Sequence, residues 1–292
     1  MTRRLILHIG MHKTGATSIQ RFLSRNRLAL RALGVLYPRT RGADGRREPK
    51  HNALFHAISH EADHGAPHPR LGPSAEVVDA LSRRIEGSRA GVAVLSAEGL
   101  SGERPVFARA LAPLAGRFET RVVVFLRRPD RWVESFYRQM VMSDEAREWR
   151  SLSAFVAAPE TQAHLDYAAI LGWWAEAFGT AALRVGRFAP ESDARTPTEL
   201  FLKAAGLPEG LARLPYGRVH ANAAATADIV RERLLQNLAE AQRKGVAPTE
   251  SPAPTTLRLS DDDRENVLLT CADGLAFIRA TYPLAEEGPL FA

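Results

Sequence analysis

Four short apolar runs recur along the chain, and each is bounded by glycine, proline or charged residues. They predict strands at Leu5–Ile9, Val92–Ser96, Val122–Leu126 and Leu183–Phe188. Runs of this length that are rich in valine, isoleucine and leucine and lack polar alternation are typical of strands buried on both faces of a parallel sheet.

Segments with apolar residues at helical spacing alternate with these strands. They predict helices that begin near Thr17, Ala75, Asp130, Ala163, Thr198, Ala223 and Asp261. Strands that alternate with helices favour an α/β fold, because right-handed crossovers place helices on both faces of a mostly parallel sheet. We therefore expect three layers, with a central sheet between two layers of helices.

The pattern shows no internal repeat and no clear break, so we expect residues 1–292 to form a single domain. Segment 38–75 is rich in glycine, proline, histidine and arginine, which predicts an insertion or lid instead of a core element. Segment 245–254 is predicted as a connecting loop before a last helix, within a helical C-terminal part over 221–292.

A glycine loop follows the first predicted strand. It runs from His8 to Thr17 with the letters HIGMHKTGAT and leads into a predicted amphipathic helix. The N–H groups at a helix start lack intrahelical acceptors, the helix dipole adds positive potential there, and Lys13 supplies a full charge. A strand, a tight glycine loop and a helix start together predict an anion-binding site.

The position of the lysine indicates what kind of anion binds. In the nucleoside-triphosphatase motif G-x-x-x-x-G-K-[ST], the lysine follows the second glycine and the next hydroxyl holds magnesium. Here Lys13 precedes Gly15, and no Gly-Lys-Ser/Thr sequence occurs in the loop. This arrangement favours a shorter anion, with a P-loop phosphotransferase as an alternative.

A second strand-to-helix junction carries basic residues. Arg127 follows the strand over 122–126, and Pro129 and Asp130 suit the first turn of a helix that runs through Met142. Arg127 would then project from the carboxyl end of a parallel strand, where open α/β sheets bind ligands. A guanidinium can hold a phosphate through two parallel hydrogen bonds, and a hydroxyl from Ser135 in the second turn can join it.

These two segments resemble the sulfotransferases that use 3′-phosphoadenosine 5′-phosphosulfate (PAPS). Residues 13–17 resemble the 5′-phosphosulfate loop, and residues 127–135 resemble the 3′-phosphate segment. The resemblance is clearest over residues 5–37 and 92–142, and it implies a P-loop-like fold, PAPS as cosubstrate and sulfuryl transfer to a hydroxyl or amine. Among relatives it is similar to stand-alone bacterial carbohydrate enzymes, which implies a saccharide acceptor. Ala16 stands where the family often has threonine, so a non-catalytic nucleotide- or glycan-binding relative is the second hypothesis.

The resemblance also implies residue roles. The residues expected to hold the donor are Lys13, Thr14, Gly15, Ala16, Thr17, Ser18, Arg127, Ser135 and Arg218. Lys13 is expected to act in catalysis as well, because an ammonium there stabilises the charge that grows on the bridging oxygen as the S–O bond breaks.

Sulfuryl transfer also needs a base that takes the proton of the acceptor hydroxyl. Glu98 comes just after the strand over 92–96, at the same sheet edge as the loop, and family members often carry the base after a strand in this way. Glu98 is therefore the first candidate, with a purely structural carboxylate as the alternative. His51 is the second candidate, with a solvated loop histidine as its alternative.

Composition narrows the partners. The formal net charge is +6, nearly all of it from arginine, since the lysines are only Lys13, Lys50, Lys203 and Lys244. The arginines are dispersed among acids and no nucleic-acid-reading module is visible, so we expect an anionic nucleotide donor and no nucleic acid. Oligomeric state cannot be derived from these features.

Targeting signals and disulfides are not expected. No run approaches the roughly eighteen apolar residues that span a bilayer, and His8 and Gly10 interrupt the first apolar run too early for a secretion signal. Cys271 is the single cysteine, which excludes an internal disulfide. The chain is therefore expected to be a cytoplasmic enzyme.

One motif favours a different enzyme class. Residues 60–64, His-Glu-Ala-Asp-His, match H-E-x-x-H, in which two histidines one helical turn apart bind zinc, and Glu86 is available as a third ligand. Gly65 and Pro67 follow at once, however, and five of the nine histidines lie within 51–68. A histidine-rich loop without metal is therefore preferred, and a zinc peptidase is kept as an alternative.

Overall fold

The computed structural model describes residues 3–189, 197–215, 225–247, 256–286 and 290–291. The chain divides into two compact units, the first formed by residues 1–126, 167–217 and 275–292 and the second by 127–166 and 218–274. The single domain predicted over 1–292 stays a prediction, because these units are defined by their internal contacts and not by independent folding. Each unit is built from separate stretches of chain, so no linker marks the boundary in the sequence.

A five-stranded sheet forms the centre of the first unit. Its strands in spatial order are β2 (Val35–Leu36), β5 (Val92–Ser96), β1 (Arg4–His8), β6 (Glu119–Arg127) and β7 (Leu183–Phe188). β1 pairs in parallel with β5 and β6, and β2 pairs in parallel with β5. This confirms the expected α/β class with a mostly parallel central sheet, and the bounds of β5 and β7 are those predicted.

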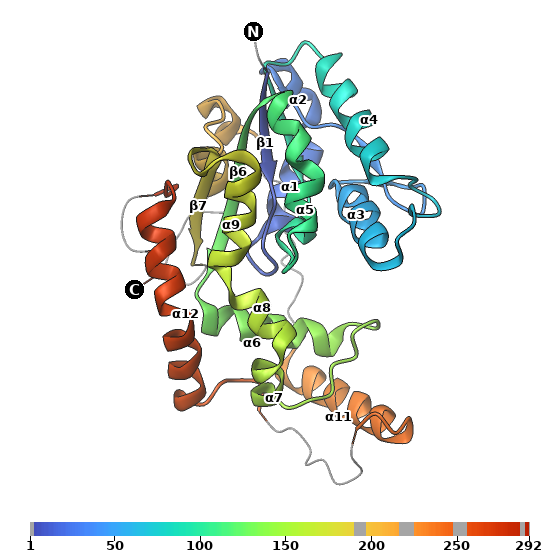
Figure 1. Ribbon diagram of the computed structural model, residues 1–292, viewed down its shortest axis with the longest axis vertical. Coiled ribbons are helices and arrows are strands. Elements are labelled where there is room, and N and C mark those ends of the chain that lie inside the picture. Colours follow the sequence, from blue (N-terminus) through green and yellow to red (C-terminus); the bar gives the residue numbers. More distant parts are fainter. Residues whose placement is uncertain (1–2, 190–196, 216–224, 248–255, 287–289, 292) are drawn as a thin grey trace. The chain divides into compact units, whose positions relative to one another are not determined.

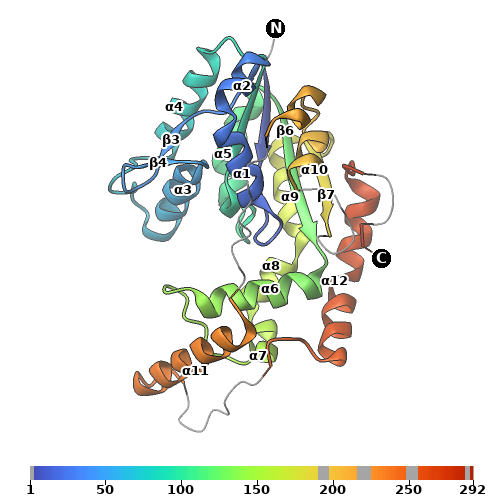
Figure 2. The ribbon, with the colours of Figure 1, turned by 180° about the vertical axis from the view of Figure 1, so that it is seen from behind.

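Helices cover both faces of this sheet. Figure 1 shows α5 (Val106–Leu111) and α9 (Tyr167–Phe178) on one face, and Figure 2 shows α1 (Ala16–Arg25) and α10 (Pro197–Ala204) on the other. Alternate strand side chains such as Ile6 and Val94 pack with residues of α1 and α10 in one buried cluster. The remaining elements of this unit are α2 (Arg27–Ala32), η1 (Glu98–Ser101), η2 (Ala112–Gly116), η3 (Thr180–Ala182) and η4 (Glu209–Arg213).

Segment 38–75 differs from the loop-like insertion that was expected. It contains a small hairpin of β3 (Thr40–Arg41) and β4 (Arg47–Glu48), then α3 (Asn52–His64), which precedes α4 (Ser74–Glu86). α3 buries Ala53, Leu54, Ala57 and Ile58, so it is a packed helix. The role of 38–75 as an insertion or lid stays a prediction, but its histidine, glycine and proline content hid the apolar face of α3 from sequence analysis.

The second unit is helical. Its elements are α6 (Pro129–Met142), α7 (Leu152–Ala157), α8 (Pro159–Leu165), α11 (Ala227–Arg243) and the first part of α12 (Asp261–Thr281). α6 contacts α7 and α11, and it buries Trp132 and Tyr137 completely. The helix predicted to begin near Ala163 is in fact two helices, α8 and α9, with Asp166 between them.

An ion-pair network fastens the start of α6 to the start of α12. The carboxylate of Asp130 has no exposed area and accepts hydrogen bonds from Arg128 Nε at 2.7 Å, from Arg128 Nη2 at 2.8 Å and from Arg264 Nη1. Arg264 Nη2 also donates to Glu134 Oε1 at 3.1 Å. Each buried carboxylate has a charged donor. The network therefore joins two helix starts that are more than a hundred residues apart in the sequence.

Candidate functional site

The loop between β1 and α1, residues 9–15, is called the Lys13 loop here. Gly10, Lys13 and Gly15 have positive φ angles of 55°, 67° and 82°. Glycine adopts this left-handed region without steric cost, but for a lysine the conformation is uncommon and costs about 1–3 kcal/mol. Strain of this kind persists only where the surroundings impose it, and it is frequent at ligand-binding sites.

Close packing around the two glycines imposes this path. A Cβ added at Gly10 would lie 2.9 Å from the Cα of Glu98, and one added at Gly15 would lie 2.6 Å from Cγ of Pro197. Inside the loop, the hydroxyl of Thr14 donates to the carbonyl of Met11 at 2.7 Å. The Lys13 loop is therefore pressed between the end of β5 and the start of α10.

The start of α1 offers donors to an anion. Its first turn contains no acidic residue, and its N-cap is Gly15, which provides no side-chain acceptor. The N–H groups of the first helical turn and the helix dipole therefore act toward the loop without an internal counter-charge. Thr17 is exposed and Ser18 is half-buried at this end of the helix. Together with the charge of Lys13, the geometry suits a phosphate or sulfate group.

Glu98 lies next to this loop, as its position after β5 predicted. It is the first residue of η1, its side chain is 26% exposed, and its Oε1 lies 3.6 Å from Nδ1 of His12. Burial raises the pKa of Glu98, but hydrogen bonds from His12 and from the backbone of Lys13, with the charge of Lys50, outweigh burial and leave the pKa below its usual value. The carboxyl group of Glu98 is therefore ionised at neutral pH.

His51 has a different environment. It is completely buried, its Nε2–H donates to the carbonyl of Pro38 at 3.1 Å, and its Nδ1 accepts from the backbone N–H of Ser96 at 3.1 Å. Burial lowers the pKa of His51 to about 4. Because both ring nitrogens are bonded to the backbone, these contacts give His51 a structural role at the end of β5, and they do not support the role of a base.

A buried network lies at the ends of β1 and β5. Nδ1 of His8 pairs with the hydroxyl of Ser96 at 2.8 Å, and Gln20 Nε2 donates to the same hydroxyl at 3.2 Å. Burial lowers the pKa of His8 to about 4, so the ring is neutral at physiological pH. The network joins β1, β5 and α1 at the points where the Lys13 loop begins and ends. Sequence reasoning did not find it, because its three members are polar residues within apolar elements.

The other predicted donor residues are placed as follows. The side chain of Thr14 is buried and bonded within the loop, and Ala16 is 1% exposed, with its methyl group beside Gly10. Arg127 is the last residue of β6, and Ser135 lies on α6; both belong to the second unit. Their approach to the Lys13 loop stays a prediction. Arg218 lies outside the described residues.

His12 is a loop residue next to Glu98 whose side chain the sequence reasoning did not select. It lies between the two glycines of the loop, and its Nδ1 reaches the carboxylate of Glu98. A histidine inside an anion-binding loop is a signal that can be read from sequence, since its ring can donate to a carboxylate or to a ligand oxygen.

The H-E-x-x-H motif does lie on a helix, α3, but its residues have other partners. Glu61 accepts at Oε1 from the backbone N–H of Ser74 at 2.8 Å and at Oε2 from the Ser74 hydroxyl, so it caps α4. His60 Nδ1 pairs with the carbonyl of Ala66 at 3.0 Å. Among the described residues, no group of three or more His, Cys, Asp or Glu side chains is arranged to hold a metal ion. These contacts argue against a zinc peptidase.

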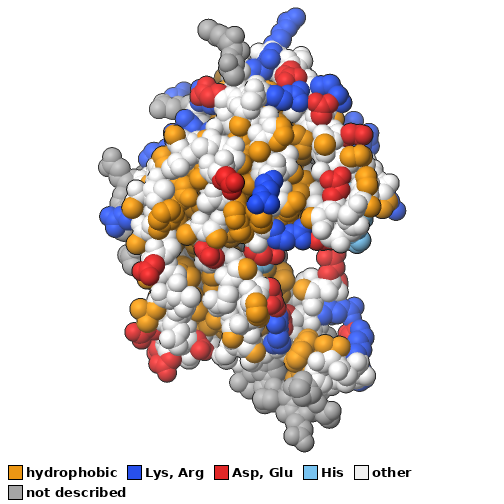
Figure 3. Space-filling model, in the orientation of Figure 1, with side chains coloured by type: hydrophobic (Ala, Val, Ile, Leu, Met, Phe, Trp, Pro, Cys, Tyr) orange, Lys and Arg blue, Asp and Glu red, His pale blue; other side chains and the backbone are white. Residues whose placement is uncertain are grey.

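Surface charge adds little to the definition of the site. On the face drawn in Figure 3, Lys and Arg side chains lie among Asp and Glu side chains and do not gather in one stripe.

Within the part of the chain that the structure describes, no helix has the length and apolar character needed to cross a bilayer.

Fold and loop together define an α/β protein with an anion-binding geometry at the end of its central strand. No family model matches the chain, and no curated protein matches it. Among solved structures, the chain is similar to a sulfotransferase from Alicyclobacillus acidocaldarius, with 18% sequence identity, 96% of each chain covered and a TM-score of 0.48. An activity for this chain therefore has to be argued from the Lys13 loop and the residues that contact it.

Proposed function

We propose that this protein is a sulfotransferase that moves the sulfuryl group of PAPS to a hydroxyl or amine of an acceptor, with a saccharide as the preferred acceptor class. One observation carries the proposal. A lysine held in the left-handed region precedes a helix whose first turn has no acidic residue, and an ionised glutamate that follows the neighbouring strand is packed against the same loop.

The residues present fit the phosphosulfate end of the donor. Such a group needs several hydrogen-bond donors and one compact positive charge, and no carboxylate in the helix turn that faces it. The first turn of α1 and Lys13 meet these needs, with further hydroxyls from Thr17 and Ser18. Arg127, Ser135 and Arg218 are proposed for the 3′-phosphate. When bound, the donor supplies an electrophilic sulfur.

The chain's own residues then have two tasks. Glu98 accepts the proton of the acceptor group while the acceptor oxygen or nitrogen forms its bond to sulfur and the bridging S–O bond breaks. Lys13 stays with the bridging oxygen and offsets the negative charge that develops there. His12 holds the carboxylate of Glu98 from the loop side, so that base and lysine are oriented by the same short segment.

Two alternatives are weaker. A non-catalytic relative is suggested by Ala16, but this residue is buried, and its methyl group packs beside Gly10. A P-loop phosphotransferase needs a hydroxyl for magnesium, and the hydroxyl of Thr14 is already bonded to Met11.

The test is the heat of binding of 3′-phosphoadenosine 5′-phosphate (PAP) to the full chain. We expect binding by the natural protein, a loss of about 100-fold in affinity for Lys13→Ala, and no change for Lys244→Ala, which removes an exposed lysine paired with Glu240. If the natural protein gives no heat with PAP, the proposal is wrong. If PAP binds but PAPS never yields a sulfated product with any sugar or amine, the non-catalytic alternative replaces it. Magnesium-dependent consumption of ATP would instead support the phosphotransferase.

A further inference from the structure

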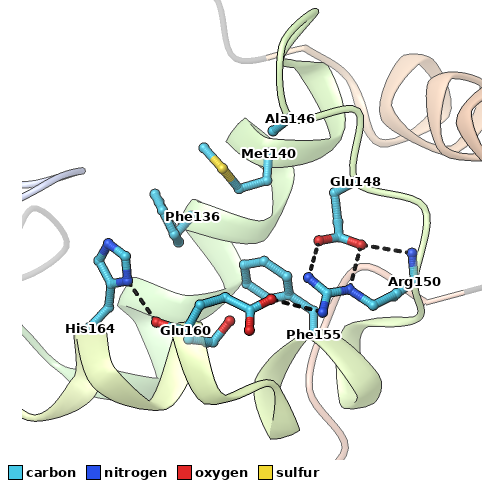
Figure 4. A pocket seen from close by; sticks show the side chains of 9 residues that line it. Phe136, Met140, Ala146, Glu148, Arg150, Phe155, Glu160 and His164 are labelled. Carbon is cyan, nitrogen blue, oxygen red and sulfur yellow. Dashed lines mark hydrogen bonds and ion pairs between the residues drawn. The ribbon is translucent and has the colours of Figure 1, made fainter. Parts of the chain in front are cut away.

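The second unit contains a pocket that the proposed reaction does not yet use. It lies between α6, α7, α8 and the loop that joins α6 to α7, has a volume of about 250 Å³, and is shown in Figure 4. Its apolar lining is provided by Phe136, Met140 and Phe155. Pockets that bury a drug-sized ligand measure about 300–1,000 Å³, so this α6–α8 pocket suits one ring of a ligand.

The charged groups of the pocket are already paired. Arg150 donates through Nε to Glu148 Oε1 at 2.9 Å and through Nη2 to Glu148 Oε2 at 2.7 Å, and its Nη1 lies 2.9 Å from Glu160 Oε1. Figure 4 shows the guanidinium held between these two carboxylates. One arginine and two glutamates leave the lining with net negative charge. An anionic ligand would therefore meet repulsion, with the only lining guanidinium engaged.

Two further polar residues border the pocket. Thr161 is 1% exposed, and its Oγ1 is buried without a hydrogen-bond partner among the described residues. A buried hydroxyl without a partner costs free energy that a ligand can recover by bonding to it. His164 Nδ1 pairs with the carbonyl of Glu160 at 2.8 Å, so that in the neutral ring the proton lies on Nδ1.

We propose that the α6–α8 pocket binds a sugar ring of the acceptor that is either uncharged or carries an ammonium group, and that it excludes uronic acids and sulfated rings. The proposal rests on the sulfotransferase function above. A sugar ring has an apolar C–H face that fits the lining of Phe136 and Phe155, and it has hydroxyls at its edge. Those hydroxyls donate to the carboxylate of Glu160, which is 57% exposed, and bond to the unpartnered hydroxyl of Thr161.

The charge of the pocket makes the proposal specific. A neutral or ammonium-bearing ring gains a hydrogen-bond partner in Glu160 without disturbing Arg150. A carboxylate or sulfate on the ring would instead add negative charge to a pocket lining whose net charge is already negative. Glucosamine is therefore expected to bind more tightly than glucose, and glucuronate is expected not to bind.

Saturation-transfer difference NMR on the full chain tests this proposal with glucose, glucosamine and glucuronate as probes. We expect transfer to the ring C–H protons of glucose and glucosamine and none to glucuronate. Thr161→Val keeps the side-chain shape and is expected to weaken glucose binding by about 5–10-fold, since one hydrogen bond is worth about 1 kcal/mol. The matched control is Thr270→Val, which changes an exposed threonine on α12 and should leave binding unchanged.

A second variant tests the charge argument without touching a buried group. Glu160→Gln should reduce the preference for glucosamine over glucose to about one. Binding of glucuronate equal to that of glucose, an unchanged affinity in Thr161→Val, or no sugar signal at all would each overturn the pocket proposal. PAP binding is measured in the same samples: PAP binding without a sugar signal rejects only the pocket, and absence of PAP binding rejects the sulfotransferase function instead.

Discussion

The Lys13 loop and the α6–α8 pocket are built by opposite means. The loop gets its shape from backbone: three positive φ angles, a helix start, and two glycines in close contact with neighbouring elements. The pocket gets its shape from side chains on α6, α7, α8 and the loop that joins α6 to α7, above all from the ion pairs of Arg150 with Glu148 and Glu160. The shape of the Lys13 loop is therefore expected to be sensitive to substitution of its glycines. The shape of the α6–α8 pocket is expected to be sensitive to substitution of its charged side chains.

The two regions also differ in charge. The loop presents N–H groups and a lysine and suits an anion, whereas the pocket has net negative charge and suits a neutral or cationic ring. If the proposed function and the pocket proposal both hold, this difference would keep the two substrates from exchanging places, because each region rejects the charge that the other requires.

The largest effect is expected at the carboxylate next to the loop. Glu98→Gln should lower kcat for sulfate transfer by about 10²–10⁴-fold, since the proton acceptor is lost, while PAP affinity stays within a few-fold. Glu119→Gln, at the exposed start of β6, is the matched control and should keep full activity. Turnover by Glu98→Gln within a few-fold of the natural protein would remove Glu98 from the mechanism.

The next effect concerns the pocket's ion pairs. Arg150→Met leaves Glu148 buried without its charged partner, so the free energy of unfolding should fall by about 3 kcal/mol in urea denaturation. Glu148→Leu combined with Arg150→Met should recover part of this loss, because an apolar pair replaces a buried ion pair at little cost. A double variant as unstable as the single one would show that the site is not held by these charges.

A smaller effect separates backbone strain from close contact. Gly34 has a φ of +77° with no atom within 4 Å of an added Cβ, whereas a Cβ at Gly15 meets Pro197. Gly34→Ala should therefore cost about 1 kcal/mol of unfolding free energy, and Gly15→Ala about 2–3 kcal/mol. Only Gly15→Ala should also weaken PAP binding. Equal costs for both variants would mean that the contact between the loop and α10 is not tight.

The smallest effect is a pH dependence of stability. His8 and His51 have pKa values of about 4 in the folded protein, below the usual 6.5, because burial disfavours the cation. The unfolded chain takes up these protons first, so stability falls as pH drops from about 6.5 toward 4, by about 1–2 kcal/mol per histidine at pH 5. Thermal unfolding at pH 7.5, 6 and 5 measures this. His51→Gln should flatten the profile and His60→Gln, on the outer part of α3, should not; a profile that rises on acidification would contradict the assignment.

Local features account for what the sequence could predict. The strand, glycine loop and helix start around Lys13 lie within twenty-five residues at the start of the chain, and Glu98 follows a strand that pairs directly with β1. Parallel strands bring their carboxyl ends to one edge of a sheet, so the proximity of Glu98 to the loop followed from topology alone. The roles proposed for these residues stay predictions.

Features that depend on distant neighbours could not be predicted. His51 was predicted as a second candidate base or a solvated loop histidine, and its burial could not be predicted because it depends on Tyr37, Pro38 and Ser96, which contact it from other segments. The α6–α8 pocket also needs α7 and α8, which have six and seven residues and whose apolar patterns are too brief to recognise. The division into two compact units could not be predicted, because each unit is formed by several separate stretches of chain.

The last consequence concerns the far edge of the sheet. Val185 of β7 donates its N–H to the carbonyl of Pro283 at 3.1 Å and accepts from the N–H of Ala285 at 2.8 Å, so the residues that cover this edge come late in the sequence. During synthesis the ribosome releases β7 long before it releases residues 283–285, and until then the nascent sheet exposes unsatisfied backbone groups. The pairing of β7 with residues 283–285 can therefore form only after this late segment has been synthesised.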